Sequence, residues 1–302
     1  MKTRIFACTI SLSCSLYQAT SFLAPQSIIR YPSLLFDSVS QLTSSPERYA
    51  ASMGLTMEEM EIIQANRTAR SQALHETLQS SSLTGPEKHA LLCQHVVAHG
   101  QHPFVCPTCW TYQPICVCRP VRDEYDIPIQ QVVLWTHHDE WGSVSNTGSV
   151  LPLLLKDVSM KLKGLPEHDA WLDKLLNDPA VLPVVLWTDH NPSENHYYYS
   201  TDELLQADKP IVLIAMEGTW RNSRRMVSKL PVAGRWSLTR EQVLSGASIR
   251  EQGPSPNHAC TAEAVVGALV ALGLDPTKGA SVLQLVNQKV NLTRRYQGHG
   301  WK

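Results

Sequence analysis

Short apolar runs separate longer stretches of mixed polarity along the second half of the chain. The runs cover residues 132–136, 182–187 and 210–216, and they are rich in β-branched residues. Such continuous runs are typical of strands that are buried on both faces, as in a parallel sheet. Helical patterns lie between them, at residues 151–162 and after the capping box that begins at Ser200. The alternation predicts an α/β domain with a mostly parallel sheet flanked by helices.

Helices are also predicted on both sides of this domain. Capping boxes begin at Thr56 and Thr84, so residues 46–100 are predicted to form a helical N-terminal extension. Two more helices close the chain. One covers residues 261–272, and the other begins at Asp275, where an N-cap residue is followed by proline.

Polar, reactive residues follow each of the apolar runs. The first run is followed by His137 and Glu140, the second by Asp189 and His190, and the third by Glu217. In open α/β sheets, ligands bind outside the carboxyl ends of the strands. The sequence therefore predicts a ligand site at this edge of the sheet.

The composition is that of a globular protein, with 302 residues, of which 43% are hydrophobic and 18% charged. No stretch approaches the roughly 20 apolar residues of a membrane helix, and nothing indicates a stable membrane association or an obligate protein partner. The formal net charge of -1 excludes a strongly basic protein, so RNA binding requires a local basic patch. The residues that could contact phosphates, or that simply end solvated helices, are Arg221, Arg224, Arg225, Lys289, Arg294, Arg295, His299 and Lys302.

Four of the eight cysteines crowd into a short segment, as Cys106-x-x-Cys109 and Cys116-x-Cys118. In a chain of this length, such crowding favours a metal site over a disulfide framework. Four thiolates complete the tetrahedral shell of a structural zinc ion and leave no open position. Residues 104–120 are therefore predicted to form a zinc knuckle, and the alternative is a loop with free thiols.

Several small or polar residues near the strand ends are candidates for binding a ligand. Ser145 to Gly148 offer exposed backbone N–H groups, Gly218 allows a ligand to approach the backbone, and Trp220 offers a flat face for a ring. Taken singly, each is explained at least as well by an ordinary N-cap turn or by a core tryptophan. Three further candidates are Arg250, Thr261 and Glu263.

The N-terminal residues have the features of a targeting leader. Residues 1–21 combine a positive start, a short apolar stretch and small residues at Ala19 and Ser21, as in a secretory signal. Residues 22–45 are rich in serine and contain one acidic residue, which suits a transit peptide. The junction around Phe22 resembles that of bipartite presequences in algae with complex plastids. We therefore expect a plastid protein, with a mitochondrial leader or plain secretion as the alternatives.

The order of these pieces resembles the DTW-domain family. The resemblance covers roughly residues 100–300. In chain order, its pieces are the cysteine knuckle, His137-x-x-Glu140, Asn146-Thr147-Gly148, Gly218-Thr219-Trp220, Arg250 and Thr261-x-Glu263-Ala264. Two positions depart from the family pattern: Glu217 stands where the motif usually begins with aspartate, and Cys260 stands in place of serine.

The resemblance implies a fold and a reaction. The family is similar to the SPOUT class of RNA-modifying enzymes, whose α/β sheet carries a C-terminal knot that binds S-adenosylmethionine. Residues 101–302 would form the DTW domain, with the transferase core at residues 130–302. The implied reaction moves the 3-amino-3-carboxypropyl group of S-adenosylmethionine to N3 of a tRNA uridine. Glu217 is the first candidate for the base, with His137 or Glu140 behind it. The implied ligands of S-adenosylmethionine are Asn146, Thr147, Gly148, Gly218, Thr219, Trp220, Arg250, Thr261 and Glu263.

Two other functions are compatible with the same residues. An RNA methyltransferase would also use S-adenosylmethionine and would have a similar fold. It would differ in the mass of the modified nucleoside that it produces. A non-catalytic zinc-containing RNA-binding protein would use the α/β domain as a scaffold and would not bind S-adenosylmethionine. A sister group of aminocarboxypropyltransferases acts on ribosomal RNA and lacks the cysteine knuckle, so the knuckle favours tRNA.

Overall fold

The computed structural model describes residues 53–79, 82–100, 104–118, 124–187, 197–230, 234–239 and 259–296, together with residues 47, 50, 51 and 242. The predicted leader at residues 1–45 lies outside the described residues, as do Asp189, His190 and Arg250. Residues 243–258 are also outside, and the knot implied by the resemblance stays a prediction.

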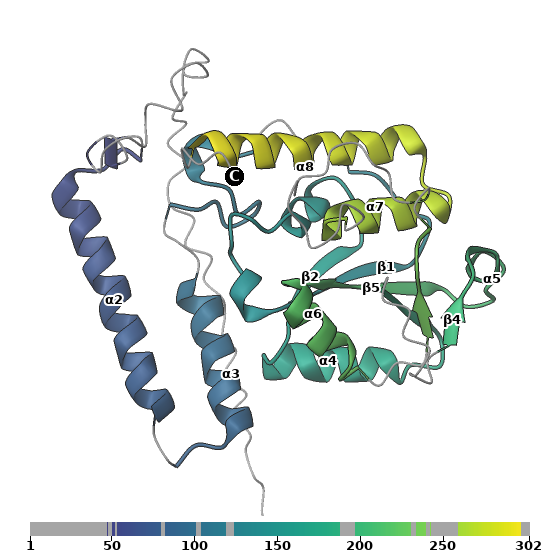
Figure 1. Ribbon diagram of the computed structural model, residues 1–302, viewed down its shortest axis with the longest axis horizontal. Coiled ribbons are helices and arrows are strands. Elements are labelled where there is room, and N and C mark those ends of the chain that lie inside the picture. The colour runs from purple at the N-terminus through teal and green to yellow at the C-terminus, as the bar shows by residue number, and fades with distance from the viewer. Residues whose placement is uncertain are drawn as a thin grey trace, which may run out of the picture. The chain divides into compact units, whose positions relative to one another are not determined.

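A six-stranded sheet forms the centre of the described protein, and every pair of neighbouring strands is parallel (Figure 1). The strand order is β2-β1-β5-β3-β6-β4. The strands are β1 (Gln131–Thr136), β2 (Val158–Leu162), β3 (Leu182–Leu186), β4 (Tyr197–Tyr199), β5 (Ile211–Glu217) and β6 (Gly234–Trp236). The three apolar runs of the sequence are β1, β3 and β5, and these three strands lie side by side in the sheet. The predicted α/β fold with a parallel sheet is therefore confirmed.

Helices cover both faces of the sheet. In Figure 1, α7 and α8 lie on one face, and α4 and α6 lie on the other. The helices of this region are α4 (Pro166–Leu176), α5 (Thr201–Leu205), α6 (Trp220–Val227), α7 (Thr261–Ala271) and α8 (Pro276–Tyr296), with short 3₁₀ turns η4 (Gln113–Ile115), η5 (His138–Glu140) and η6 (Gly148–Leu153). The two terminal helices begin and end as the sequence predicts. Asp275 caps α8 by accepting a hydrogen bond from the backbone N–H of Thr277 at 2.8 Å, and Gly273 follows α7 with a φ of 112°.

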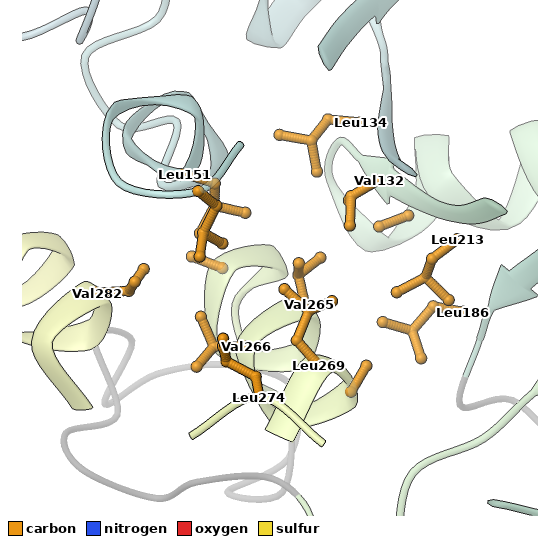
Figure 2. Close-up of a cluster of buried hydrophobic side chains, with 14 of the residues drawn as sticks. Val132, Leu134, Leu151, Leu186, Leu213, Val265, Val266, Leu269, Leu274 and Val282 are labelled. Carbon is orange, nitrogen blue, oxygen red and sulfur yellow. The ribbon is translucent and has the colours of Figure 1, made fainter. Parts of the chain in front are cut away.

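The central strands β1, β3 and β5 each contribute to two separate cores because successive side chains point to opposite faces. In β5, Leu213 and Ala215 pack with α7, α8 and η6, whereas Val212 and Ile214 pack with α4 and α6. Figure 2 shows the first of these cores, in which leucines of the sheet meet Val265, Val266 and Leu269 of α7 and Val282 of α8. Glu217 has the same parity as Ala215, so its side chain belongs to the face covered by α8 and η6.

The prediction of a helix over residues 151–162 is wrong. The chain there forms the turn η6, which ends at Leu153, and then the edge strand β2 (Val158–Leu162). Pro152 lies inside η6, and Asp157 has a φ of 55°, which an α-helix does not accommodate. The apolar residues also fit the two-residue period of a strand, at Val158, Met160 and Leu162. Pairing with β1 stabilises the strand over the helix.

The N-terminal extension is helical, as predicted. It contains α2 (Met57–Gln79), α3 (Gly85–His95) and a π-helical turn, η3 (Val96–Gly100). Both capping boxes are present: the N–H of Glu59 donates to the Thr56 hydroxyl, and the N–H of Glu87 donates to the Thr84 hydroxyl. None of the described helices combines the length and the apolar character that crossing a membrane would require.

Candidate active site and zinc knuckle

The first two cysteines lie on a tight backbone turn. The N–H of Cys106 donates to the carbonyl of Thr111 at 2.7 Å, and the N–H of Trp110 donates to the carbonyl of Cys106 at 3.0 Å. Trp110 has a φ of 55°, in the left-handed region that few non-glycine residues adopt. The turn η4 then leads the chain back to the second cysteine pair.

The four thiols form one cluster with the geometry of a zinc shell. The Sγ atoms of Cys106 and Cys118 are 3.7 Å apart, as are those of Cys109 and Cys116. A Zn–S bond of about 2.3 Å places the sulfurs of a tetrahedral site about 3.8 Å apart. All four ligand atoms lie within 4.8 Å of one another, so the group can bind a zinc ion with little rearrangement.

Neighbouring groups favour a thiolate within this cluster. Hydrogen bonding from Cys106, followed by Cys116 and Cys118, lowers the pKa of the Cys109 thiol. The hydroxyl of Thr111 lies 2.6 Å from the sulfur of Cys109 and adds to this effect. The thiolate is the form that binds metal, so this shift favours binding through Cys109. The neighbouring cysteines raise the pKa of Cys116 and Cys118, so zinc would have to displace the protons of these two thiols.

A buried lysine ties the knuckle to the body of the domain. The Nζ of Lys289, on α8, donates to the carbonyl of Cys109 at 2.7 Å, to the carbonyl of Asn146 at 2.6 Å and to the hydroxyl of Ser149 at 2.6 Å. Burial lowers the pKa of Lys289 to about 8, against the opposing effects of Cys109 and Glu217. The side chain is 1% exposed. The suggestion that Lys289 contacts RNA phosphates is therefore wrong.

The ends of β1 and β5 meet at the predicted edge of the sheet. Thr136 pairs with Glu217, and the N–H of His137 donates to the carbonyl of Glu217 at 2.8 Å. Glu217 is 3% exposed, and its charge interacts with that of Lys289. The pair of polar strand ends expected from the sequence is thus present, with an acid on the inner side and a histidine next to it.

The segment Asn146-Thr147-Gly148 lies against the Glu217 carboxylate. A Cβ at Gly148 would lie 2.7 Å from Oε2 of Glu217, so only glycine leaves room for the carboxylate there. The side-chain N–H₂ of Asn146 donates to the carbonyl of Glu140 at 3.1 Å, and its oxygen accepts from the N–H of Ser149 at 3.0 Å. Asn146 is fully buried, so its amide shapes the turn that carries Gly148.

The motif Gly218-Thr219-Trp220 forms the turn from β5 into α6. The hydroxyl of Thr219 accepts a hydrogen bond from the N–H of Asn222 at 3.3 Å and so caps α6. Thr219 is exposed, and Gly218 and Trp220 are half-buried. The ring of Trp220 lies 5.9 Å from that of Trp187, at the end of β3. This turn is therefore a part of the candidate site that a ligand can reach.

His137 is positioned by groups on both sides. Its Nδ1 accepts from the backbone N–H of Asp139 at 3.3 Å and lies 3.3 Å from the side-chain nitrogen of Asn222, which also donates to Asp139 at 3.2 Å. Burial, followed by the charge of His138, lowers the pKa of His137 to about 4. With Nδ1 accepting, a neutral His137 carries its proton on Nε2. Asn222 is a site residue that the sequence analysis missed.

The start of α7 closes the site from the other side. The hydroxyl of Thr261 donates to the carbonyl of Met216 at 3.2 Å, and the N–H of Cys260 donates to Glu263 at 2.8 Å. Burial, followed by the Glu263 charge, raises the pKa of Cys260 to about 12, so it is a thiol at neutral pH. It hydrogen-bonds to Thr147, which joins α7 to the Gly148 turn. Glu263 thus caps its own helix, the simpler of its two interpretations.

The family model described as the DTW domain matches residues 103–294, which is more than half of the chain. The chain belongs to the DTW-domain family. No curated protein and no solved structure is significantly similar to it. The DTW-domain family is linked to tRNA modification. The matched residues begin just before the knuckle and end within α8, so they include the cysteines, Glu217 and Lys289 but not α2 and α3.

The DTW domain carries an exposed basic face next to the Gly218 turn. It consists of residues on or just after α6, namely Arg221, Arg224, Arg225 and Lys229. Arg295, at the end of α8, is also exposed, whereas His299 and Lys302 lie outside the described residues. The chain as a whole carries a net charge of only -1, so binding of an anionic ligand near the site would depend on this local group of basic residues.

Glu140 and Arg250 are the two remaining candidate residues. Glu140 is the last residue of η5 and is 9% exposed, and its carbonyl accepts from Asn146 rather than facing solvent. Arg250 lies outside the described residues, so its part in the site stays a prediction. The sequence does contain a signal for the burial of Lys289. At helical spacing, Lys289 continues the apolar stripe of α8 formed by Val282 and Val286.

Proposed function

We propose that this DTW protein transfers the 3-amino-3-carboxypropyl group of S-adenosylmethionine to N3 of a tRNA uridine. The bond that forms joins uridine N3 to the γ-carbon of the methionine moiety. The bond that breaks is the one between this carbon and sulfur, whose electron pair leaves with methylthioadenosine. The N3 proton passes to a base. The atoms and charges of the reaction balance without any redox partner.

One observation carries the proposal. Within a DTW domain, Glu217, His137 and Gly218 meet at the carboxyl ends of two adjacent parallel strands, where α/β sheets bind their ligands. The flat, half-buried ring of Trp220 is suited to the adenine of S-adenosylmethionine. Positioning the nucleophile and the carbon in line would then supply much of the rate enhancement.

Glu217 is our first candidate for the base that takes the N3 proton. It is the acid at the end of the central strand β5, and Lys289 supplies a nearby positive charge that favours its ionised form. Because Glu217 is 3% exposed, a uridine would approach it beside the half-buried Gly218 and the exposed Thr219. The extra methylene relative to the usual aspartate lengthens that reach.

His137 would act as a hydrogen-bond donor rather than as the base. Its Nδ1 already accepts from Asp139, so the proton on Nε2 is the group that it offers to a ligand. A uracil carbonyl oxygen is a suitable acceptor for this proton. Glu140 stays behind Glu217 as a candidate for the base because it is the last residue of η5 and not the end of a strand.

The remaining parts of the proposal concern the partner and the compartment. The basic face of α6 would contact tRNA phosphates and orient the uridine towards the Gly218 turn. Zinc in the knuckle would be structural. We also propose that the N-terminal leader directs the protein to a plastid, and a reporter fused to residues 1–45 that stays in the cytosol would refute this.

The reaction is tested by the mass of its product. The full chain is incubated with unmodified tRNA and S-adenosylmethionine, the RNA is digested, and the nucleosides are weighed by mass spectrometry. A uridine heavier by one aminocarboxypropyl group is the expected result. A methyl adduct would instead make the protein a methyltransferase. No adduct, together with no binding of S-adenosylmethionine, would leave a zinc-containing RNA-binding protein.

The role of Glu217 is tested by Glu217→Gln, which keeps the shape of the side chain and removes its charge. Loss of a general base should lower kcat by about 10²–10⁴-fold while binding of S-adenosylmethionine and folding persist. Glu167→Gln, at an exposed position in the first turn of α4, is the matched control and should change nothing. Near-normal kcat in Glu217→Gln would remove Glu217 from this role.

A further inference from the structure

A second group of metal-ligating side chains lies outside the cysteine knuckle. His89 and Cys93 project from α3 one helical turn apart, and His138 follows β1. One ligand atom from each lies within 4.8 Å of the other two. We propose that His89, Cys93 and His138 bind a second transition-metal ion, with zinc as the best fit to this ligand set.

The distances within the group suit a tetrahedral ion. The sulfur of Cys93 lies 3.9 Å from Nε2 of His89. Zn–S and Zn–N bonds of about 2.3 and 2.0–2.1 Å place a sulfur and a nitrogen about 3.6 Å apart. A shift of a few tenths of an ångström therefore closes the pair on an ion. The rings of His89 and His138 have centroids 5.5 Å apart, close enough for both to reach it.

An unsatisfied nitrogen on His138 provides an independent sign of a missing ligand. Its Nδ1 is buried, and no group among the described residues hydrogen-bonds to it. Buried polar atoms are nearly always partnered, so this atom calls for an explanation. The other nitrogen, Nε2, lies 3.3 Å from the carboxylate of Asp139. A histidine that binds metal through one nitrogen commonly donates its other N–H to a carboxylate, and Asp139 is placed for this role.

The backbone around His89 is built to bring its ring close. Gly164 has a φ of 90°, and a Cβ there would lie 2.2 Å from a carbon of the His89 ring and 2.9 Å from the sulfur of Cys93. Any other residue at this position would push both ligands away. Without metal, the Cys93 thiol donates to the carbonyl of Lys163 at 3.2 Å. Metal binding would release this thiol proton to solvent and form the metal–sulfur bond in its place.

The proposed site would join two parts of the chain. His89 and Cys93 belong to the helical extension, before the residues that match the DTW model, whereas His138 lies within that match. The ion would therefore fix α3 to the loop that carries His137. Three protein ligands leave a fourth position for water, unlike the closed shell of the cysteine knuckle.

The first test is a count of metal ions in the purified full chain after gel filtration. One zinc ion is expected in the knuckle and a second at His89, Cys93 and His138. A single zinc ion in the wild type would overturn the proposal. The count does not depend on catalysis, so its outcome is separate from that of the transferase proposal.

Variants then locate the second ion. Cys93→Ser and His138→Gln should each lose one zinc per chain, whereas His75→Gln, at an exposed histidine of α2, should lose none. Retention of both ions in Cys93→Ser and His138→Gln would refute the assignment. If these variants do not fold, the wild type is titrated with Co²⁺. A second equivalent that adds a thiolate-to-cobalt charge-transfer band supports the site, and one that adds no such band refutes it.

Discussion

Lys289 offers the sharpest test of how the knuckle and the candidate site are coupled. Its ammonium group makes three short hydrogen bonds, to the carbonyls of Cys109 and Asn146 and to the hydroxyl of Ser149. Lys289→Met keeps the length of the side chain and removes all three. Removing one partner of a buried charged network typically costs about 3–5 kcal/mol. Lys289→Met also removes the cost of burying a charged ammonium group, which favours the low end of this range. We therefore expect the free energy of unfolding to fall by about 3 kcal/mol.

This loss should be measurable by thermal unfolding in saturating zinc. For a domain of this size, 1 kcal/mol lowers Tm by roughly 2–4 °C, so the expected drop is roughly 6–12 °C. Lys278→Met is the matched control, because Lys278 is an exposed lysine on the same helix. The reasoning fails if Lys289→Met and Lys278→Met unfold at the same temperature.

Two further predictions concern the Gly148 turn and the cysteine knuckle. Gly148→Ala places a methyl group 2.7 Å from the Glu217 carboxylate, so it should lower stability by about 1–3 kcal/mol and impair binding of S-adenosylmethionine, measured by calorimetry. Gly85→Ala, with nothing within 4 Å, is the control, and equal effects of the two changes would contradict the geometry. Removing zinc with a chelator should raise hydrogen exchange in residues 104–118 and leave α4 unchanged; unaltered exchange in the knuckle would show that no structural ion was lost.

The local elements of the fold could be predicted because their signals are local. The strands β1, β3 and β5 are continuous apolar runs, and the helix starts at Thr56 and Thr84 are set by side chains that bond to the nearby backbone. The failure at residues 151–162 has the opposite cause. The apolar spacing there fits both a helix and a strand. Pairing with β1 decides between them, and the periodicity of the segment carries no information about that pairing.

The candidate site was only partly accessible to the same reasoning. The order of motifs identified Glu217, Gly148 and His137, and the structure brings these three together. It could not reveal that Asn222 contacts His137, because the two residues are far apart in the chain. Nor could it reveal that Lys289 is buried against Cys109, since a lysine near the end of a helix is usually solvated.

The sequence by itself determined the fold class, the helix caps, the four-cysteine metal motif and the membership of a family, because each depends on residues close together in the chain or on their order. The tertiary structure alone decided which charges are buried and which side chains meet. The charges of Glu217 and Lys289 came to interact in the interior only when β5 and α8 packed together. Likewise, His138 approached His89 and Cys93 only when α3 packed against residues 162–165. Burial and proximity are properties of packing, so no local pattern encodes them.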